Sequence, residues 1–311
     1  GRMRSVALGL ASSVRSGEPL TEALEAYPNV FSPIYVSLVR SAEVSGRVAD
    51  ALAQIVSYLE WREHLAREIR RATFYPAVVL AATIAVLAVL FGWTLPRLFE
   101  QLDGVAVELP PLTRVVRAVA FGVARHAGAI VLGACLGASA WLAVGSTDRG
   151  RIALDRFLLR IPLYGRVLTE LVTARFVRVF RTLSSTGVNV VLALELAARS
   201  SGNRFFEQEI SVARDRILLD GASLTDALSG SSTLPGLVRR MFRAGEDTGQ
   251  LELTLGAAHE YYERQVPLAV SWFLRWFELA VLLVLGGVVL AVVLSIYLLL
   301  AEVVRQASGM A

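Results

Sequence analysis

The sequence contains no lysine: its 31 basic residues are all arginine, and its single cysteine is Cys135. A phosphate-binding loop uses a lysine to hold the nucleotide phosphates, and Schiff-base catalysis uses a lysine amine. The missing lysine therefore argues against a P-loop ATPase and against a pyridoxal-phosphate enzyme. One cysteine cannot form an internal disulfide, and because Cys135 lies within an apolar run we expect it to be a small packing residue.

Charge is also missing from three long stretches. The chain has 311 residues, 55% of them hydrophobic, and about 20 apolar helical residues are enough to cross a bilayer. Transmembrane helices are predicted at residues 77–95, 127–145 and 277–301. The first two, and the apolar run Leu279–Ala301 within the third, contain no acidic or basic residue. A transporter usually keeps ionisable residues inside its spans, so this pattern argues against transport.

The arginines are distributed unevenly among the segments that connect the spans. Nine lie in residues 1–76 and seventeen in residues 146–276, against four in residues 96–126 and one in the tail 302–311. Arginine beside a span favours the cytoplasmic side. We therefore predict that residues 1–76 and 146–276 are cytoplasmic, and that the loop 96–126 and the tail are periplasmic. Because these arginines flank spans, the net charge of +4 is not taken to indicate nucleic-acid binding.

The two predicted cytoplasmic segments contain one helical unit twice. The sequence SGEPLTEAL at 16–24 returns as DGASLTDAL 204 positions later, and LVRSAEVSGRVADAL at 38–52 returns as MFRAGEDTGQLELTL 203 positions later. We call residues 1–76 the first copy and residues 146–276 the second copy. The predicted fold is an all-α polytopic membrane protein with two repeated cytoplasmic helical-bundle domains and three transmembrane helices.

The second copy is predicted to hold about six helices, of which the first two occupy roughly residues 168–200. The repeat offset places their counterparts in the first copy before residue 1, so the first copy is expected to be truncated. Gly187, Gly202 and Gly221 stand where left-handed caps would end helices. Ser223, followed three residues later by an acidic residue, resembles a capping box, and Pro235 suits a first helical turn.

The most informative motif is a short corner that occurs in both copies, as AEVSG in the first and GEDTG in the second. We expect the hydroxyl residue to cap the next helix, the glycine to supply free backbone angles, and the glutamate to accept hydrogen bonds from exposed N–H groups. The alternative is that the paired glutamates bind a partner or a cation, although a lone carboxylate is a poor calcium site. The corner residues are Glu43, Ser45, Gly46, Glu246, Thr248 and Gly249.

Two further motifs concern chemistry and packing. The sequence HEYYE, which begins at His259, lacks the second histidine of a zinc-protease helix, so we interpret it as a helix surface. Since no nucleophile is placed beside a base, we predict no enzyme activity, catalytic residue, metal site or cofactor. Ala129, Gly133 and Gly137 recur every four residues and predict close helix packing in the membrane. The alternative is that small residues are simply common in this chain.

Taken in order along the chain, these motifs resemble a known family, the type II secretion protein F family. Its members are inner-membrane platform proteins of type II secretion and type IV pilus machines. The sequence departs from the family pattern where Ala42 replaces a glycine, Thr248 replaces a serine, and Leu279 replaces a proline. The resemblance rests on the G-x-x-L-x-x-A-L signatures at Gly17 and Gly221, the two corners, Tyr75-Pro76, Leu109-Pro110 with Thr113, Leu158–Pro162 with Gly165, and Ala174-Arg175-Phe176.

The resemblance implies a multi-pass protein of the bacterial inner membrane that has no cofactor. Its implied partners are a hexameric assembly ATPase, pilin-like subunits, other inner-membrane assembly proteins and further copies of itself. Force would pass through the Arg62–Pro76 helix into the first span, and through the helix ending near Trp276 into the third. The alternatives are a helical permease subunit, another membrane adaptor, or an intramembrane peptidase. The peptidase would need catalytic aspartates at membrane depth, whereas Asp103 is unpaired in the outer loop.

Overall fold

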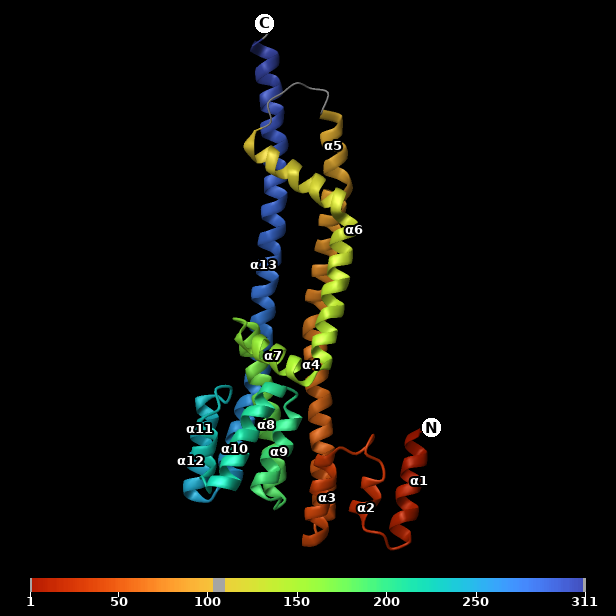
Figure 1. Cartoon of the computed structure of the whole chain (residues 1–311), viewed down its shortest axis with the longest axis vertical. Helices are drawn as coiled ribbons and strands as arrows, with labels where there is room; N and C mark the ends of the chain where they lie inside the picture. Colours follow the sequence, from red (N-terminus) through yellow and green to blue (C-terminus); the bar gives the residue numbers. More distant parts are fainter. Residues whose placement is uncertain (1, 103–109, 310–311) are drawn as a thin grey trace. The chain divides into compact units, whose positions relative to one another are not determined.

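The structure is a computed structural model that describes residues 2–102 and 110–309 (Figure 1). Throughout this described part, every regular element is a helix, which confirms the predicted all-α class. Asp103 and Leu109, named above in the outer loop, lie outside the described residues. The elements are α1 (Arg2–Arg15), α2 (Leu20–Glu25), α3 (Pro33–Ser45), α4 (Val48–Val89), the π-helix η1 (Leu90–Thr94), α5 (Leu95–Leu102), α6 (Pro111–Ser146), α7 (Asp148–Arg160), α8 (Tyr164–Ser185), α9 (Val190–Ser200), α10 (Arg204–Asp220), α11 (Leu224–Ser229), α12 (Gly236–Thr248) and α13 (Leu251–Gly309).

Residues with special backbone preferences end and begin these helices. Gly187, Gly202 and Gly221 lie just beyond α8, α9 and α10 with φ of +78°, +80° and +65°, as predicted. The Ser223 hydroxyl accepts a hydrogen bond from the Asp226 N–H at 3.0 Å and caps α11. Pro235 was expected in a first helical turn, but it is the N-cap of α12 and lies one residue before that turn. Its extended ψ of 147° explains why the helix starts only after it.

The helix boundaries are consistent with the predicted duplication. Helix α2 corresponds to α11 when 204 is added to its residue numbers, and α3 corresponds to α12 when 203 is added. The same offset of 203 places the start of α4 on the start of α13. The one-residue slip therefore falls in the loop between the first two paired helices, where a changed length does not alter either helix.

The chain divides into two compact units, Gly1–Ile69 with Thr147–Val270, and Arg70–Ser146 with Ser271–Ala311. The first unit, which we call the helical unit, contains α1–α3, the first half of α4, α7–α12 and the start of α13. The second, which we call the span unit, contains the rest of α4 and α13 with η1, α5 and α6.

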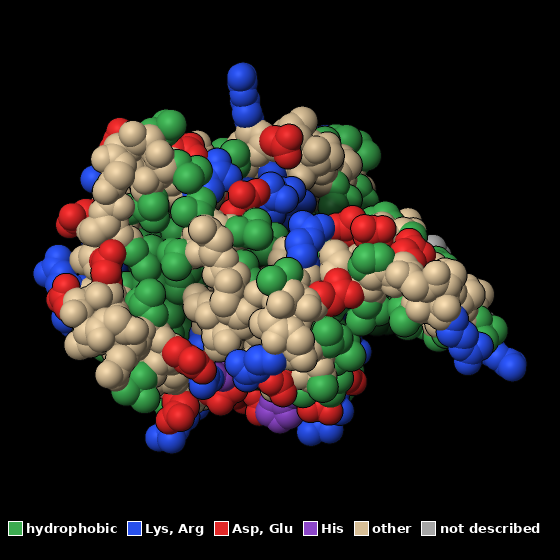
Figure 2. All heavy atoms as spheres, turned by 90° about the horizontal axis from the view of Figure 1, so that it is seen from below, with side chains coloured by type: hydrophobic (Ala, Val, Ile, Leu, Met, Phe, Trp, Pro, Cys, Tyr) green, Lys and Arg blue, Asp and Glu red, His purple; other side chains and the backbone are tan. Residues whose placement is uncertain are grey.

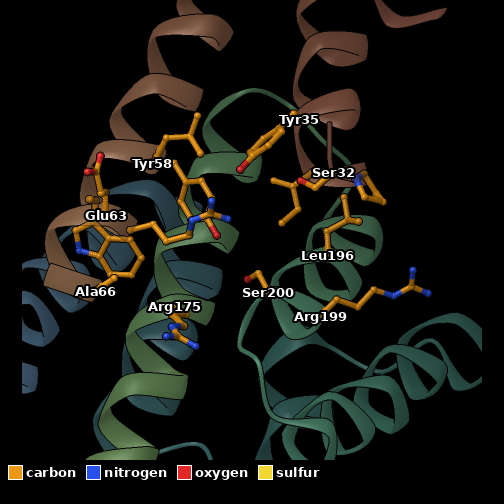
Figure 3. Close-up of a pocket in the computed structure, with 14 residues that line it drawn as sticks. Ser32, Tyr35, Tyr58, Glu63, Ala66, Arg175, Leu196, Arg199 and Ser200 are labelled. Atoms are coloured by element: carbon orange, nitrogen blue, oxygen red, sulfur yellow. The ribbon is translucent and has the colours of Figure 1, made fainter. Parts of the chain in front are cut away.

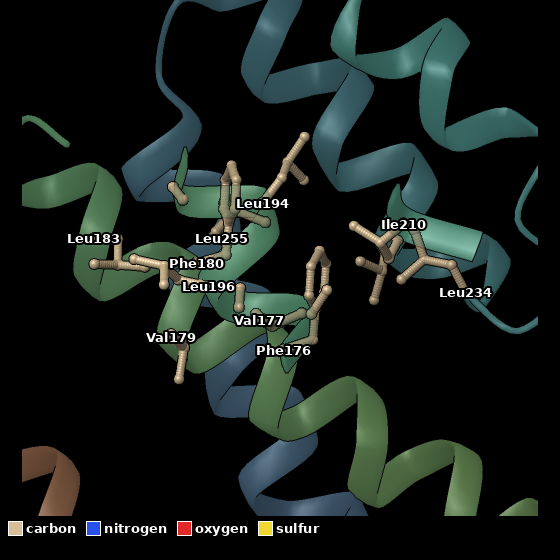
Figure 4. Close-up of a cluster of buried hydrophobic side chains, with 14 of the residues drawn as sticks. Phe176, Val177, Val179, Phe180, Leu183, Leu194, Leu196, Ile210, Leu234 and Leu255 are labelled. Carbon is tan, nitrogen blue, oxygen red and sulfur yellow. The ribbon is translucent and has the colours of Figure 1, made fainter. Parts of the chain in front are cut away.

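The core of the helical unit is built on α8. Phe176 and Phe180 of this helix are fully buried and lie among side chains from α9, α10 and α13, including Leu194, Ile210 and Leu255 (Figure 4). Each buried side chain of this size stabilises the fold by about 1.5–3 kcal/mol. The aromatic contacts at the centre are Phe176–Phe206 at 5.2 Å and Phe180–Phe242 at 5.1 Å between ring centroids.

The span unit has a smaller core near the end of α5. Leu95, Phe99, Val116 and Val292 are buried together, and the Thr113 hydroxyl donates to the Ser295 carbonyl at 3.1 Å. The connection 96–126, predicted as a loop, is helical at residues 96–102 and 111–126. The reason is that η1 and α5 continue directly from α4, and that α6 begins well before the second apolar stretch.

Within residues 2–102 and 110–309, three helices are long and apolar enough to cross a membrane: Val48–Gln101, Pro111–Ser146 and Leu251–Glu302. The first and third also run unbroken from the helical unit into the span unit, through Pro76 in α4 and Pro267 in α13. Each proline removes one backbone hydrogen bond without ending its helix. The chain is thus continuously helical at both places where it leaves the helical unit toward an apolar stretch.

Candidate functional site

The corner of the first copy lies between α3 and α4 and contacts the start of α2. Helix α3 ends at Ser45, and Gly46 follows with φ of +71°, a left-handed conformation that suits glycine. The Glu43 carboxylate oxygens accept hydrogen bonds from the Leu20 N–H at 2.6 Å and from the Thr21 N–H at 3.2 Å. The Thr21 hydroxyl also donates to the same carboxylate. Glu43 therefore satisfies N–H groups at the start of α2, whose own N-cap, Pro19, makes no side-chain hydrogen bond.

The corner of the second copy repeats this arrangement. Glu246 accepts from the Leu224 N–H at 2.7 Å and from the Thr225 N–H at 2.8 Å, at the start of α11. Gly249 follows α12 with φ of +69°. The glutamate of each corner thus holds the helix that begins in its own G-x-x-L-x-x-A-L signature, which explains why these two motifs occur together in both copies.

Hydrogen bonding holds both carboxylates in the charged form. Partial burial raises the pKa of Glu43, but the hydrogen bonds from Thr21 and the Leu20 N–H outweigh it and leave the pKa below 4.5. Partial burial likewise raises the pKa of Glu246, and the hydrogen bonds from Thr225 and Leu224 bring it below 4.5. A carboxylate that accepts several N–H bonds is more stable charged than protonated.

The hydroxyls of Ser45 and Thr248 do not cap the following helices, contrary to the prediction. Ser45 was expected to cap the following helix, but its hydroxyl donates to the Ser41 carbonyl at 3.1 Å within α3. Thr248 likewise donates to the Ala244 carbonyl at 2.7 Å within α12. Because both residues still belong to the helix that ends there, their hydroxyls satisfy its carbonyls and not the N–H groups of the next one.

A structural corner uses the glutamate oxygens as hydrogen-bond acceptors within the chain, whereas partner or cation binding needs oxygens that are free to bind another group. Both oxygens of Glu43 and of Glu246 already accept from N–H donors. Among the described residues, no group of three His, Cys, Asp or Glu side chains lies close enough to hold a metal ion. The geometry favours the structural corner, and the partner or cation role of Glu43 and Glu246 stays a prediction.

A second polar cluster, which the sequence did not reveal, joins the two copies through Arg178 of α8. Its side chain is 14% exposed and donates through Nη2 to the Ser57 carbonyl at 3.1 Å and the Ser57 hydroxyl at 2.9 Å. Its Nη1 contacts Glu263 at 3.1 Å, and the guanidinium carbon lies 5.1 Å from the Trp61 ring centroid. Burial lowers the pKa of Arg178, while the nearby Glu263 raises it. We call these residues the arginine junction; they connect α4, α8 and α13.

His259 belongs to the arginine junction, contrary to the helix-surface interpretation. The side chain is buried, with 6% of the residue exposed, and Nε2 lies 2.6 Å from Arg178 Nη1. The guanidinium only donates, so the contact with Arg178 requires Nε2 to accept, while the same Nε2 also lies 3.0 Å from Glu263 Oε1. Arg178 lies between the apolar residues Val177 and Val179, but Arg175 of the same helix is also flanked by apolar residues, so the sequence does not single out this arginine.

A third carboxylate clamp occurs in the second copy. Glu209 of α10 accepts from the Ser231 hydroxyl at 2.8 Å and from the N–H groups of Ser232 and Thr233 at 3.0 and 3.1 Å. Burial raises the pKa of Glu209, but the hydrogen bonds outweigh this effect and hold the pKa below its ordinary value. The position 204 residues earlier is Ser5, so this clamp of the loop after α11 has no carboxylate counterpart.

The same segments match a known protein family. The family described as type II secretion system protein F matches residues 1–96 and 176–299. The chain belongs to this family. Its two matched stretches are consistent with the duplication, since each contains one acidic corner and the apolar helix that follows it. Together with the three apolar helices, membership of the protein F family indicates an inner-membrane protein.

Similar proteins come from both secretion and pilus systems. The chain is 30% identical over 297 residues to the type II secretion system protein F of Pseudomonas aeruginosa, covering 96% of this chain and 73% of that protein. It is 31% identical over 308 residues to the type IV pilus assembly protein PilC of Thermus thermophilus, covering 99% and 75%. It is 32% identical over 290 residues to the type 4 fimbrial assembly protein PilC of Pseudomonas putida, covering 93% and 72%.

This protein F family member also has a cavity of about 850 Å³ between α3 and α4 of the first copy and α8 and α9 of the second (Figure 3). Tyr35 and Tyr58 form one wall, with ring centroids 6.3 Å apart. Burial lowers the pKa of Arg175, and the nearby charge of Arg62 lowers it further although Tyr58 raises it. Gly202 leaves room for Arg175, because a Cβ there would lie 2.9 Å from its guanidinium. The residues that line the cavity include neither histidine nor cysteine.

The predicted packing stripe of the second span lies on α6. Ala129, Gly133 and Gly137 are all exposed, and a Cβ added at either glycine would meet no atom within 4 Å. Both glycines therefore have open space beside them, and close helix packing along the stripe stays a prediction.

Proposed function

We propose that this protein is an inner-membrane platform of a type II secretion or type IV pilus assembly machine. In this role its cytoplasmic helical domains engage an assembly ATPase, and its spans engage pilin-like subunits and other inner-membrane assembly proteins. Movement driven by the ATPase helps to insert each subunit into a growing pseudopilus. The proposed role is mechanical and needs no cofactor.

The observation that carries this proposal is the continuity of α4 and α13. Each helix begins directly after an acidic corner and continues into an apolar stretch without a break. A load applied to the helical unit would therefore reach the membrane through two helices instead of flexible loops. The arginine junction supports the same role, because Arg178 holds both helices against α8.

The first experiment tests the corner that starts α13. Gly249→Glu places a side chain at φ of +69° and adds a third acid beside Glu246 and Asp247. We expect secretion or pilus assembly to stop while the protein is still recovered in the membrane fraction. Gly249→Asn is the matched control, because asparagine tolerates the left-handed conformation better than other non-glycine residues; it should retain assembly.

The second experiment breaks the helix itself. Leu255→Pro removes a backbone hydrogen bond near the start of α13 and costs about 3 kcal/mol of helix stability. Leu255 is also fully buried, so Leu255→Met, which keeps the volume and the helix, serves as the control. The proline variant should insert but fail in assembly. Normal secretion or piliation with Leu255→Pro or with Gly249→Glu would contradict the platform role.

The partner claim has its own test. A photocrosslinking residue replaces Val44, which is 90% exposed at the first corner, or Asp247 at the second. Crosslinks to the assembly ATPase are expected from at least one of these positions and from neither Val304 nor Leu142, which lie in the tail and in the second apolar stretch. If no cytoplasmic position crosslinks to the ATPase in an actively assembling cell, the coupling role has no basis.

A further inference from the structure

Helix α7 is tied to the end of the second apolar helix. It begins at Asp148, two residues after α6 ends at Ser146. Consecutive Cα atoms are about 3.8 Å apart, so the first residue of α7 lies within about 8 Å of the last residue of α6. Since the second predicted span ends at residue 145, α7 begins at the membrane surface whatever the placement of the two units.

One side of α7 is fixed against the helical unit. Asp155 accepts from the Arg204 N–H at 2.7 Å, at the start of α10. The apolar residues Ile152, Leu158 and Leu159 are half-buried on the same side. These contacts hold the helix in one rotation about its axis, and they determine which residues point outward.

The outward face of α7 carries three arginines and one phenylalanine. From Arg149 to Arg160, the residues of this face are spaced four, three, one and three positions apart, which places them on one side of the helix. Phe157 is 60% exposed; Arg156 is also exposed, although its guanidinium lies 5.3 Å from the ring centroid of Phe205 on α10. Among the residues that the structure describes, Arg149, Arg156 and Arg160 form no ion pair. The outward face consists of Arg149, Ala153, Arg156, Phe157 and Arg160.

We propose that the outward face of α7 binds the phosphate groups of anionic phospholipids, with Phe157 reaching the boundary of the acyl chains. Arginine pairs well with phosphate oxygens because its N–H groups form a planar fork. Near an anionic surface each arginine strengthens binding by about fivefold. An aromatic side chain beside such arginines suits the membrane interface, where an apolar ring and a charged neighbour are both accommodated. This proposal depends on membrane insertion but not on the platform role.

The experiment uses the full chain in lipid nanodiscs. In a Cys135→Ser background, Ala153→Cys is labelled with an environment-sensitive fluorophore, because Ala153 lies at the centre of the outward face. Discs of phosphatidylcholine alone are compared with discs in which phosphatidylglycerol makes up about a third of the lipid. We expect the emission to shift to the blue, and quenching by nitroxide-labelled lipid to rise, only in the anionic discs.

Variants separate charge from folding. Arg156→Gln with Arg160→Gln should lower the equilibrium constant for binding of the outward face to phosphatidylglycerol by about 25-fold, because each arginine contributes about fivefold. The Arg156→Lys, Arg160→Lys pair keeps the charge and should retain most of the response. Arg240→Gln with Arg243→Gln, on the exposed side of α12, is the matched control and should leave it unchanged. Phe157→Ala should reduce quenching by the nitroxide lipid without removing the dependence on phosphatidylglycerol.

Four results would overturn the proposal. They are equal emission in both kinds of disc, an undiminished response in the double glutamine variant, loss of the response in the lysine pair, and the same shift on adding inorganic phosphate to neutral discs. The last result would assign the face to free phosphate instead of lipid.

Discussion

At the scale of single residues, Glu43 does work that a neighbouring N-cap would ordinarily do, because Pro19 gives α2 no side-chain cap, and Glu246 adds to the Ser223 cap of α11. The helices that they hold, α2 and α11, have six residues each, and helices this short are marginal without help from outside. A charged carboxylate at a helix start satisfies N–H groups and interacts favourably with the helix dipole. The glutamates therefore keep the chain folded back on itself at each corner.

Glu246→Gln tests this role in stability. The amide cannot accept from both N–H groups without turning its own donors toward one of them. We expect the free energy of unfolding to fall by about 1.5–3 kcal/mol, the contribution of hydrogen bonds to a charged group. Thermal unfolding of the purified protein in detergent measures the change. Asp247→Asn, at the exposed neighbouring residue, is the control; an equal shift in both variants would show that general charge, and not the corner, is responsible.

The same carboxylate predicts a dependence on pH. Hydrogen bonding keeps the pKa of Glu246 below 4.5 in the folded protein, so its stabilising contribution is fully present above the unfolded pKa and is lost as the pH falls through the folded pKa. The stability difference between the protein and its Glu246→Gln variant should be constant from pH 7 to about pH 5 and shrink at lower pH. Unfolding midpoints of both proteins across this range provide the measurement, and a gap that widens on acidification would contradict it.

At the scale of elements, the arginine junction fixes three helices to one another. Arg178 of α8 reaches Ser57 on α4 and Glu263 on α13, and its guanidinium lies over Trp61. A planar guanidinium can serve all of these at once, whereas an ammonium group cannot. The same two helices enter the apolar stretches, so this side chain adds polar contacts to the apolar core that already packs α4 and α13 against α8.

Arg178→Lys is therefore not conservative here. We expect a loss of about 1.5–3 kcal/mol in the free energy of unfolding, because the lysine cannot maintain the hydrogen bonds to Ser57 and Glu263 together. Arg181→Lys, one turn further along α8, is the matched control and should have little effect. Combining Arg178→Lys with Trp61→Leu in a double-mutant cycle isolates the ring contact. Strict additivity of the two changes would mean that Arg178 and Trp61 do not interact.

At the scale of the whole molecule, the three spans predict that both acidic corners lie in the cytoplasm and the C-terminal tail lies outside. Single cysteines at Val44, Asp247 and Val304 in a Cys135→Ser background test this arrangement. A membrane-impermeant maleimide should label position 304 in intact spheroplasts, and positions 44 and 247 only after the membrane is permeabilised. Labelling of positions 44 and 304 from the same side would be incompatible with three spans.

The local sequence determined much of this protein. Apolar runs long enough to cross a bilayer, the two copies of one unit and the left-handed glycines after α8, α9 and α10 are all visible without a structure, because each depends on residues close together in the chain. The acceptor role of Glu43 and Glu246 followed from the same kind of pattern. Membership of the protein F family rests on the order of these local features.

The tertiary structure decided which groups meet. Glu43 finds its N–H donors 22 and 23 positions away, Arg178 reaches Ser57 across 121 positions and His259 across 81. The burial of His259 and the inward turn of the Ser45 and Thr248 hydroxyls also follow from how the helices end and pack. No periodicity in one segment encodes such contacts, because they depend on the positions that other helices take up when the apolar faces of both copies are buried.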